Sequence, residues 1–260
     1  MNAPTAYLLQ LADSALILGQ RNAKWCGHGP ILEEDIALSN NSLDLIGQAR
    51  MLYQHAAELQ GNGATEDTLA YFRDVPDFKN YTLCELPHMP LMAATSAGDR
   101  DFATTIVRNF LYSSLMVLVW DQLQASKDAQ LAAIAAKSLK EVRYHLRHSR
   151  DWVVRLGDGT DESHAKVQTA VDQWMPYCQE FWSTSPQEQA AQANGTGIDM
   201  AALQNDWNQI VDAALQEATL KRPADGGFVP TGKQGVHSEH LGFVLAEMQS
   251  LARAHPQATW

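Results

Sequence analysis

The sequence has few cysteines, and their placement excludes two common uses of this residue. Cys26, Cys84 and Cys178 are odd in number, lie far apart and form no Cys-x-x-Cys pair. A disulfide framework needs an even, regularly spaced set, and a structural zinc site needs paired ligands, so we expect neither. We interpret the three residues as reduced thiols that fill small spaces in the core of a cytoplasmic protein.

Positive charge is also scarce. The chain has 19 Lys and Arg against 30 Asp and Glu, which gives a formal net charge of −11. Nucleic acids and anionic membrane surfaces both attract clustered cations. The charge balance therefore argues against either of them as a partner.

Long apolar runs are missing as well. The longest uninterrupted run near the middle of the chain, residues 115–120, is far shorter than the roughly 20 residues that span a bilayer. Residues 8–18 are apolar, but Asp13 lies among them and no Lys or Arg precedes them, which is the reverse of a secretory signal. We expect no membrane span, no signal peptide and a cytoplasmic location.

Glycine and proline are absent from residues 99–156. They disfavour helix interiors by about 1 and 3 kcal/mol, so a run of this length without them predicts helix. The natural break is at Ser126-Lys127-Asp128, because Ser or Asp can cap a new helix. Two long helices joined by so short a turn lie antiparallel, which is half of a four-helix bundle.

The rest of the chain shows no convincing strand alternation, no internal repeat and no shift in composition that marks a domain boundary. We therefore predict an all-α fold with one domain over residues 1–260. Residues 183–197 are expected to be a polar surface connection. Helices are predicted at residues 5–21, 33–59, 99–124, 129–156, 166–182 and 199–220, with a last helix ending near Ala254; those at 33–59, 99–124, 129–156 and 199–220 are expected to form the core.

One flank of the helix predicted at 129–156 carries candidate metal ligands. Glu141, His145 and His148 lie at positions i, i+4 and i+7 beside its apolar face. In ferritin-like di-iron proteins, one Glu from each of two helices and a Glu-x-x-His pair from each of the other two point inward. The pattern favours a ferritin-like four-helix bundle with additional helices, and it raises the possibility of a di-iron site.

The set of ligands is incomplete when it is counted helix by helix. The helix at 33–59 offers Asp44, the next long helix offers neither Glu nor His, and the last helix offers Glu239. Glu141 and His145 are four residues apart, not three. A site with one ligandless helix cannot neutralise two iron ions. We predict no catalytic, cofactor-binding or metal residue in this chain, and treat Asp44, Glu141, His145 and Glu239 as vestigial candidates only.

Other polar pairs have structural explanations. Glu85 and His88 form the only Glu-x-x-His of the chain, but Pro87 predicts a helix end between them, so we interpret the motif as coincidental. Glu141 and His145 can form a charge-assisted pair on one helix face. A polar line on the helix at 33–59 is either a hydrogen-bonded flank or the remnant of a metal-facing edge; it comprises Asn41, Asp44, Gln48 and His55.

Several blocks resemble one known family. They are WCGHGP at 25–30, LDLIGQAR at 43–50, AAIAAK at 132–137, KEVRYHLRHSRDW at 140–152, GVHSEHLG at 235–242 and AEMQ at 246–249. In this order they are similar to the C-subunit (PaaC) family of bacterial phenylacetyl-CoA ring 1,2-epoxidases, over nearly the whole chain.

This resemblance implies a ferritin-like bundle that serves as the non-catalytic, structural subunit of a multicomponent monooxygenase. It further implies that a homologous A subunit holds the di-iron centre and epoxidises phenylacetyl-CoA with O₂, while a reductase supplies electrons from NADPH. No catalytic residue is implied in this chain, because the family's chemistry lies on its partner. A further small subunit is a possible additional partner.

Three functions remain open from the sequence. The first is the partner subunit, and the second is an independent di-iron oxidase with a degenerate site. The third is a helical binding module without an oxygenase partner. Iron content of the purified chain separates the second from the others, and co-purification with a di-iron subunit separates the first from the third.

Overall fold

The structure is a computed structural model that describes residues 1–89 and 100–258. Over these residues it contains helices and no strand, so the predicted all-α fold class is confirmed. Short 3₁₀ helices occur at η1 (Val75–Asp77), η2 (Met175–Trp182), η3 (Ala201–Leu203) and η4 (Gly232–Gln234). The α-helices are α1 (Thr5–Ala23), α2 (Leu32–Gln60), α3 (Glu66–Tyr71), α4 (Thr82–Glu85), α5 (Phe102–Leu123), α6 (Ala129–Gly157), α7 (Asp161–Trp174), α8 (Pro186–Asn194), α9 (Gln204–Glu217) and α10 (Glu239–Ala254).

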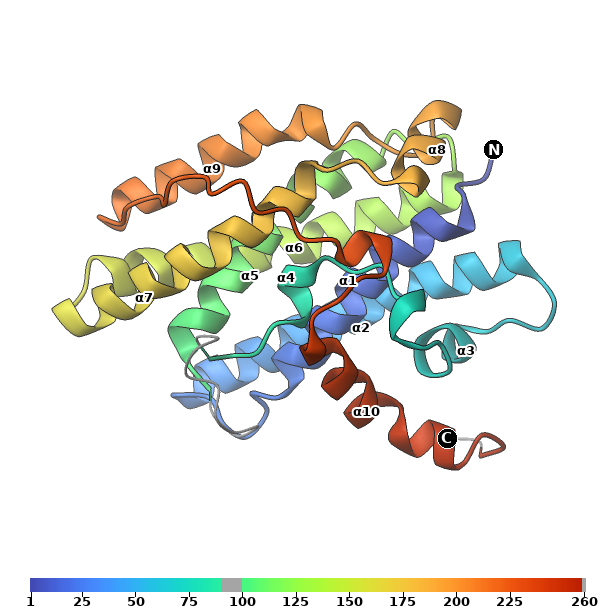
Figure 1. The fold of residues 1–260 in the computed structure, drawn as a ribbon, viewed down its shortest axis with the longest axis horizontal. Helices are drawn as coiled ribbons and strands as arrows, with labels where there is room; N and C mark the ends of the chain where they lie inside the picture. Colours follow the sequence, from blue (N-terminus) through green and yellow to red (C-terminus); the bar gives the residue numbers. More distant parts are fainter. Residues whose placement is uncertain (90–99, 259–260) are drawn as a thin grey trace.

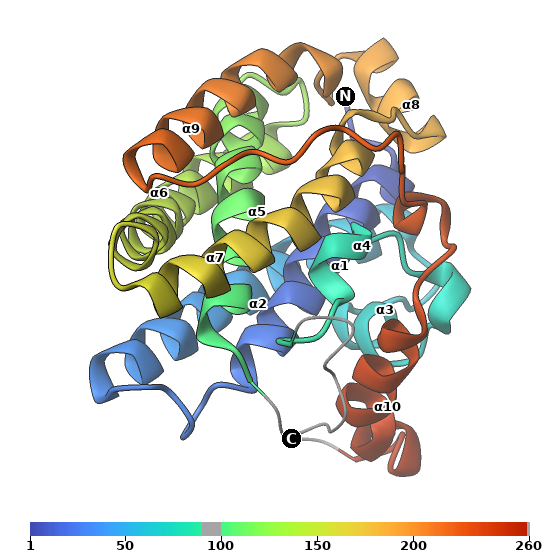
Figure 2. The same ribbon diagram turned by 60° about the vertical axis from the view of Figure 1, so that its left-hand side comes forward.

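Two helical hairpins form the core, α1 with α2 and α5 with α6, and α2 packs against α6 (Figures 1 and 2). The turn between α5 and α6 lies where the sequence predicts it. Asp128 caps α6 by accepting hydrogen bonds from the backbone N–H groups of Gln130 and Leu131, both at 3.0 Å. The predicted start of α5 is shifted, because Asp101 is its cap; Asp99 lies outside the described residues.

The fourth core helix is α1, so the prediction that residues 199–220 would fill this place is wrong. Helix α1 is buried around most of its circumference, including the side chains of Leu8, Ile17 and the charged Asp13. Helix α9 buries one face only and packs on the outside of α5 and α6. Helix α1 lies in the core because it lacks a continuous polar face, whereas α9 keeps a polar face that stays in solvent.

Two further boundaries differ from expectation. The predicted helix 166–182 changes to 3₁₀ geometry at Met175, because Pro176 cannot donate the hydrogen bond that would continue an α-helix. The segment 183–197, expected to be a polar surface connection, contains α8. Ser185 and Glu188 form a capping box at its start, with Ser185 N donating to the Glu188 carboxylate at 2.7 Å.

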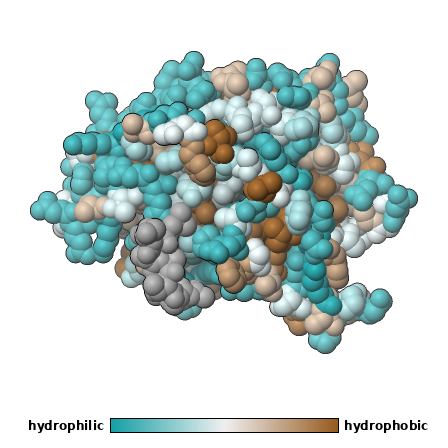
Figure 3. All heavy atoms as spheres, in the orientation of Figure 1, coloured by the Kyte–Doolittle hydropathy of each residue, from teal (hydrophilic) through white to brown (hydrophobic). Residues whose placement is uncertain are grey.

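The two sides of the four-helix core are covered differently. Helices α4 and α7 and the 3₁₀ helix η2 lie over α1 and α5, and residues 218–238, here named the strap, cross the same side on the way to α10 (Figures 1 and 2). This side is mainly hydrophilic, with small separate apolar patches (Figure 3). On the other side, the outward faces of α2 and α6 include the exposed side chains of Leu32, Leu43 and Tyr144.

Among the described helices, α5 alone is long and apolar enough to span a membrane by composition. However, 83% of its apolar window is buried inside the fold. Its hydrophobicity is that of the central helix of a packed core.

Candidate functional site at the centre of the four-helix core

All four core helices contribute to one small cavity. It has a volume of about 10 Å³, which is room for about one water molecule. Its lining is Leu18 and Asn22 from α1, Asn41 and Leu45 from α2, Asn109, Tyr112 and Ser113 from α5, and His145 from α6. A ferritin-like di-iron protein likewise assembles its ligands from four helices of one bundle.

Three of the four helices present an asparagine at this cavity. Asn22, Asn41 and Asn109 are all at least 94% buried. The side-chain oxygens of all three, and the amide nitrogen of Asn109, have no hydrogen-bond partner in the protein. Buried polar groups almost always have a hydrogen-bond partner. These amides therefore indicate that the cavity binds a polar molecule small enough to fit it. A water molecule matches both the volume and the mixture of donor and acceptor.

The fourth helix contributes His145, which is paired across the helix interface. Its Nε2 lies 2.9 Å from the Asp44 carboxylate of α2. One turn away, Gln48 donates to Glu141 at 3.0 Å, and Lys137 Nζ lies 3.9 Å from the same carboxylate. The predicted pairing of Glu141 with His145 is therefore wrong. Asp44 and Gln48 are themselves four residues apart, so α2 offers each group on α6 a partner of its own.

The structure does not bring the four vestigial candidates together as one ligand set. Asp44 and His145 contact each other, Glu141 contacts Gln48, and Glu239 is exposed in the first turn of α10. Helix α10 packs against α1, α3 and α4.

The polar line on α2 has two different roles. Asn41 lines the cavity, whereas His55 binds the capping residue Asp128 at 2.8 Å and has a structural role.

The cavity does not fit a di-iron centre. Asparagine is a neutral, weak ligand, and the only ionisable group among the lining residues besides Tyr112 is His145, which Asp44 already binds. Iron needs several carboxylates to offset its charge. Within residues 1–89 and 100–258, no group of three or more His, Cys, Asp or Glu is arranged to hold a metal.

Sequence reasoning missed Asn22 and Asn109. Asn109 lies in the middle of a strongly apolar helix, where a short polar side chain disfavours helix and has no water to bind. That position was a usable signal. Asn22 is at the end of α1, where polar residues are common, and it carries no comparable signal.

The Glu-x-x-His motif at Glu85 and His88 is divided, as predicted, because α4 ends at Glu85. His88 Nε2 binds the Arg21 carbonyl at 2.6 Å, and Arg108 Nη2 donates to its Nδ1 at 3.0 Å. Burial and the charge of Arg108 lower the pKa of His88 well below its ordinary value. His88 is thus a neutral imidazole that satisfies buried backbone and a buried arginine.

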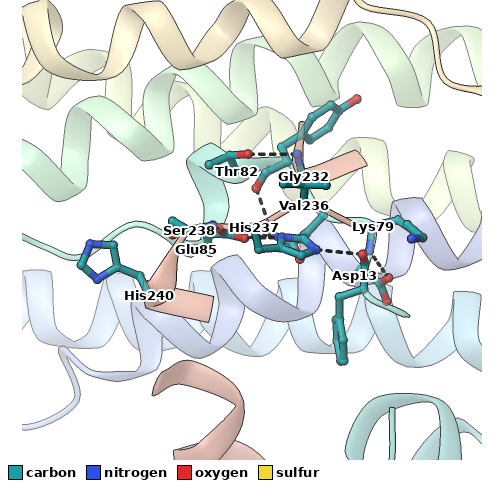
Figure 4. A network of polar contacts seen from close by, with 12 residues as sticks. Asp13, Lys79, Thr82, Glu85, Gly232, Val236, His237, Ser238 and His240 are labelled. Carbon is teal, nitrogen blue, oxygen red and sulfur yellow. Dashed lines mark hydrogen bonds and ion pairs between the residues drawn. The ribbon is translucent and has the colours of Figure 1, made fainter. Parts of the chain in front are cut away.

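Glu85 belongs to a separate polar cluster that fastens the strap and α10 to the core (Figure 4). Its fully buried carboxylate accepts hydrogen bonds from Ser238 N at 2.6 Å and Asn80 Nδ2 at 2.8 Å, and it lies 2.7 Å from His237 Nδ1. His237 Nε2 also binds the Phe78 carbonyl at 2.8 Å. Burial lowers the pKa of His237, but the hydrogen bond and charge of Glu85 outweigh this effect and raise it above its ordinary value.

Two more buried carboxylates hold the same segment. Glu180 accepts from Lys233 N and Thr82 N, both at 2.8 Å, and Glu188 forms a buried ion pair with Lys233 Nζ at 3.0 Å. Glu85, Glu180 and Glu188 therefore all bind backbone or cations of this chain, and none of the three is free for catalysis.

Comparison with known proteins is consistent with this geometry. The sequence profile of a family described as phenylacetic acid catabolic protein matches residues 1–260. The chain belongs to this family. It is also 44% identical over 260 residues, the whole of both chains, to the C subunit of the 1,2-phenylacetyl-CoA epoxidase of Escherichia coli (strain K12). Membership of the family confirms the resemblance found in the sequence, and with it the ferritin-like fold.

Proposed function

We propose that this chain is a non-catalytic, structural subunit of a phenylacetyl-CoA 1,2-epoxidase, a ring-epoxidising monooxygenase of aerobic phenylacetate degradation. It pairs with a homologous A subunit that carries the di-iron centre. The observation that carries the proposal is the neutral four-helix centre: three helices place asparagine there, and the fourth places a histidine already bound to Asp44. The likeness to the Escherichia coli protein supports the same role.

The proposal assigns the cofactors to other chains. The di-iron centre and O₂ chemistry belong to the A subunit, and a reductase delivers electrons from NADPH. This chain contributes a rigid bundle that binds the catalytic partner and stabilises its folded form by mass action. A further small subunit is compatible with the proposal.

An independent di-iron oxidase is the alternative with some support, because Asp44, Glu141 and His145 lie at one interface between α2 and α6. Against it, Asp44 and His145 bind each other, and Glu141 binds Gln48 and Lys137. In addition, α5 supplies the amide of Asn109 where a metal ligand is needed. A helical binding module without an oxygenase partner is distinguished by association alone.

Co-expression with the A subunit tests the proposal. The two chains should co-migrate on gel filtration at micromolar concentration, with one di-iron centre per A subunit and no stoichiometric iron in this chain expressed alone. With reductase and NADPH, this chain alone should not turn over phenylacetyl-CoA, and the mixture should. Full activity of the A subunit without this chain, or iron bound stoichiometrically here, would overturn the proposal.

A further inference from the structure

The outward faces of α2 and α6 form one continuous surface. The two helices are joined along their length by cross-helix pairs: His148 to Glu34 at 2.8 Å, His145 to Asp44 at 2.9 Å and Gln48 to Glu141 at 3.0 Å. On either side of this seam, the next residues around each helix point to solvent. We name this the α2/α6 face; it comprises Leu32, Ile36, Leu43 and Gly47 of α2 and Lys137, Lys140, Arg143, Tyr144 and Arg147 of α6.

The α2 half of the face is an apolar stripe. Leu32, Ile36 and Leu43 lie within about 40° of one another around the helix axis. Their exposed fractions are 71%, 51% and 66%, so nothing in the described chain covers them. Single exposed apolar residues need no explanation, but three of them on one side of a helix favour an interaction site.

Gly47 lies in the same stripe, and the chain's own packing does not require it. A Cβ added at Gly47 would meet nothing within 4 Å, and its backbone is ordinary helix. Glycine disfavours a helix interior, so its presence without an internal reason indicates close approach by something outside this chain. A glycine amid exposed leucines is suited to a second helix that packs across α2.

The α6 half is basic, although the protein is acidic. Lys137, Lys140, Arg143 and Arg147 are exposed on a chain of net charge −11. Only weak surface pairs occupy them: Lys137 reaches Glu141 at 3.9 Å, and Arg143 reaches Asp121 at 3.6 Å. Tyr144 stands among them, stacked on His148 and beneath the Arg147 guanidinium, and supplies an aromatic anchor.

We propose that the α2/α6 face is the docking surface for the di-iron A subunit, which presents a pair of helices with an apolar centre and an acidic rim. This inference rests on the proposed function. A second copy of this chain packed with α6 against α6 would oppose the four cations with the same four. The residues of the face span about 22 Å along α2 and, with the two helices side by side, about 20 Å across, which is roughly 440 Å². Contacts that continue along the rest of the two 29-residue helices bring the area to roughly 800 Å² per partner, as in a stable complex.

Docking there would also bury the polar seam. Asp44 and Glu141 are half-exposed at the surface while their partners His145 and Gln48 are buried. Covering the seam strengthens these hydrogen bonds by excluding water. The vestigial acids thus have a role in the assembled enzyme that needs no metal.

The test compares two helix glycines, both of which have open space where a side chain would be added. Gly47→Leu and Gly242→Leu each replace a helix glycine whose Cβ would meet nothing within 4 Å, the first in the α2/α6 face and the second on α10. Both should raise the Tm of the isolated chain by about 2–4 °C, because each removes a helix-interior glycine. Binding to purified A subunit is then measured by calorimetry or biolayer interferometry.

We expect Gly47→Leu to weaken binding by about tenfold or more, and Gly242→Leu to leave the Kd unchanged. Lys140→Glu with Arg147→Glu should slow association and reduce its salt dependence, whereas Lys166→Glu on α7 should not. Unchanged binding by Gly47→Leu, or weakening by Gly242→Leu instead, overturns the proposed face while leaving the partnership intact. If the unaltered chain does not bind the A subunit at all, the proposed function fails and this face fails with it.

Discussion

The two sides of the four-helix core use charged residues in opposite ways. On the α1/α5 side, Glu85, Glu180 and Glu188 are fully buried and bind backbone N–H groups, His237 and Lys233 of the strap. On the α2/α6 side, cations stand exposed beside uncovered leucines. Buried, satisfied polar groups hold a fold together, whereas exposed apolar and charged groups contribute little to the isolated chain. The first side therefore explains stability, and the second carries the face that we propose for the partner.

The largest effect should come from the covered side. Glu85→Ala removes the acceptor of Asn80, His237 and Ser238 and leaves a buried imidazole without its carboxylate. Breaking such a buried pair costs about 3–5 kcal/mol, so we expect a fall of that size in the free energy of unfolding. Urea denaturation measures it. The exposed Glu239→Ala should change stability by less than about 0.5 kcal/mol; equal losses would contradict the role assigned to Glu85.

The centre of the core should reject a carboxylate. Asn109→Asp keeps the shape but places a charge in a cavity without a cation, at an expected cost of about 3 kcal/mol at pH 7. Burial raises the pKa of such a carboxyl in the folded state. Its deficit should therefore shrink as pH falls toward 5, where the folded protein takes up the proton first.

Asn40→Asp is the matched control, because Asn40 is exposed on α2 next to the cavity-lining Asn41. It should be neutral within about 0.5 kcal/mol at either pH. A stable Asn109→Asp variant that binds iron would show instead that the centre is one residue from a working metal site.

The contact between His237 and Glu85 predicts a pH dependence of stability opposite in sign to that of Asn109→Asp. The folded pKa of His237 lies above its ordinary 6.5, so its contribution is fully present below that pH and is lost as pH rises through the folded pKa. His237→Gln should cost about 1.5–3 kcal/mol at pH 6, as expected for a hydrogen bond to a charged group, and less at pH 8. Urea titrations of both chains at the two pH values give the difference, and a larger cost at pH 8 would contradict the assignment.

The smallest effect is expected for the vestigial acid. Glu141 is half-exposed and bound to Gln48 and Lys137, so Glu141→Ala should cost less than about 1 kcal/mol. Turnover per assembled complex should be unchanged, because Glu141 touches no reacting group. A fall in kcat with the complex intact would restore the hypothesis of a metal site in this chain.

The sequence predicts most of the fold because local patterns decide it. The run without glycine or proline and the cap at Asp128 place α5 and α6 correctly. The sequence pattern predicts the wrong fourth core helix. Periodicity shows which face of α9 is apolar, but it does not show that α1 and not α9 packs beside the other three helices. The missing ligand on α5 is visible in the sequence, whereas the convergence of Asn22, Asn41 and Asn109 is not, because it depends on how four helices are rotated about their axes. Glu85 and His237 are 152 residues apart, and no pattern connects them.

Oxidative footprinting of side chains, with and without the A subunit, compares the two sides in a single experiment. Leu32, Leu43 and Tyr144 are exposed on the α2/α6 face, and Phe228 on the strap and Phe243 on α10 are exposed elsewhere. We predict that complex formation lowers the labelling of the first three at least severalfold and leaves Phe228 and Phe243 unchanged. Protection of Phe228 and Phe243, with Leu43 and Tyr144 still labelled, would show that the partner binds the covered side instead.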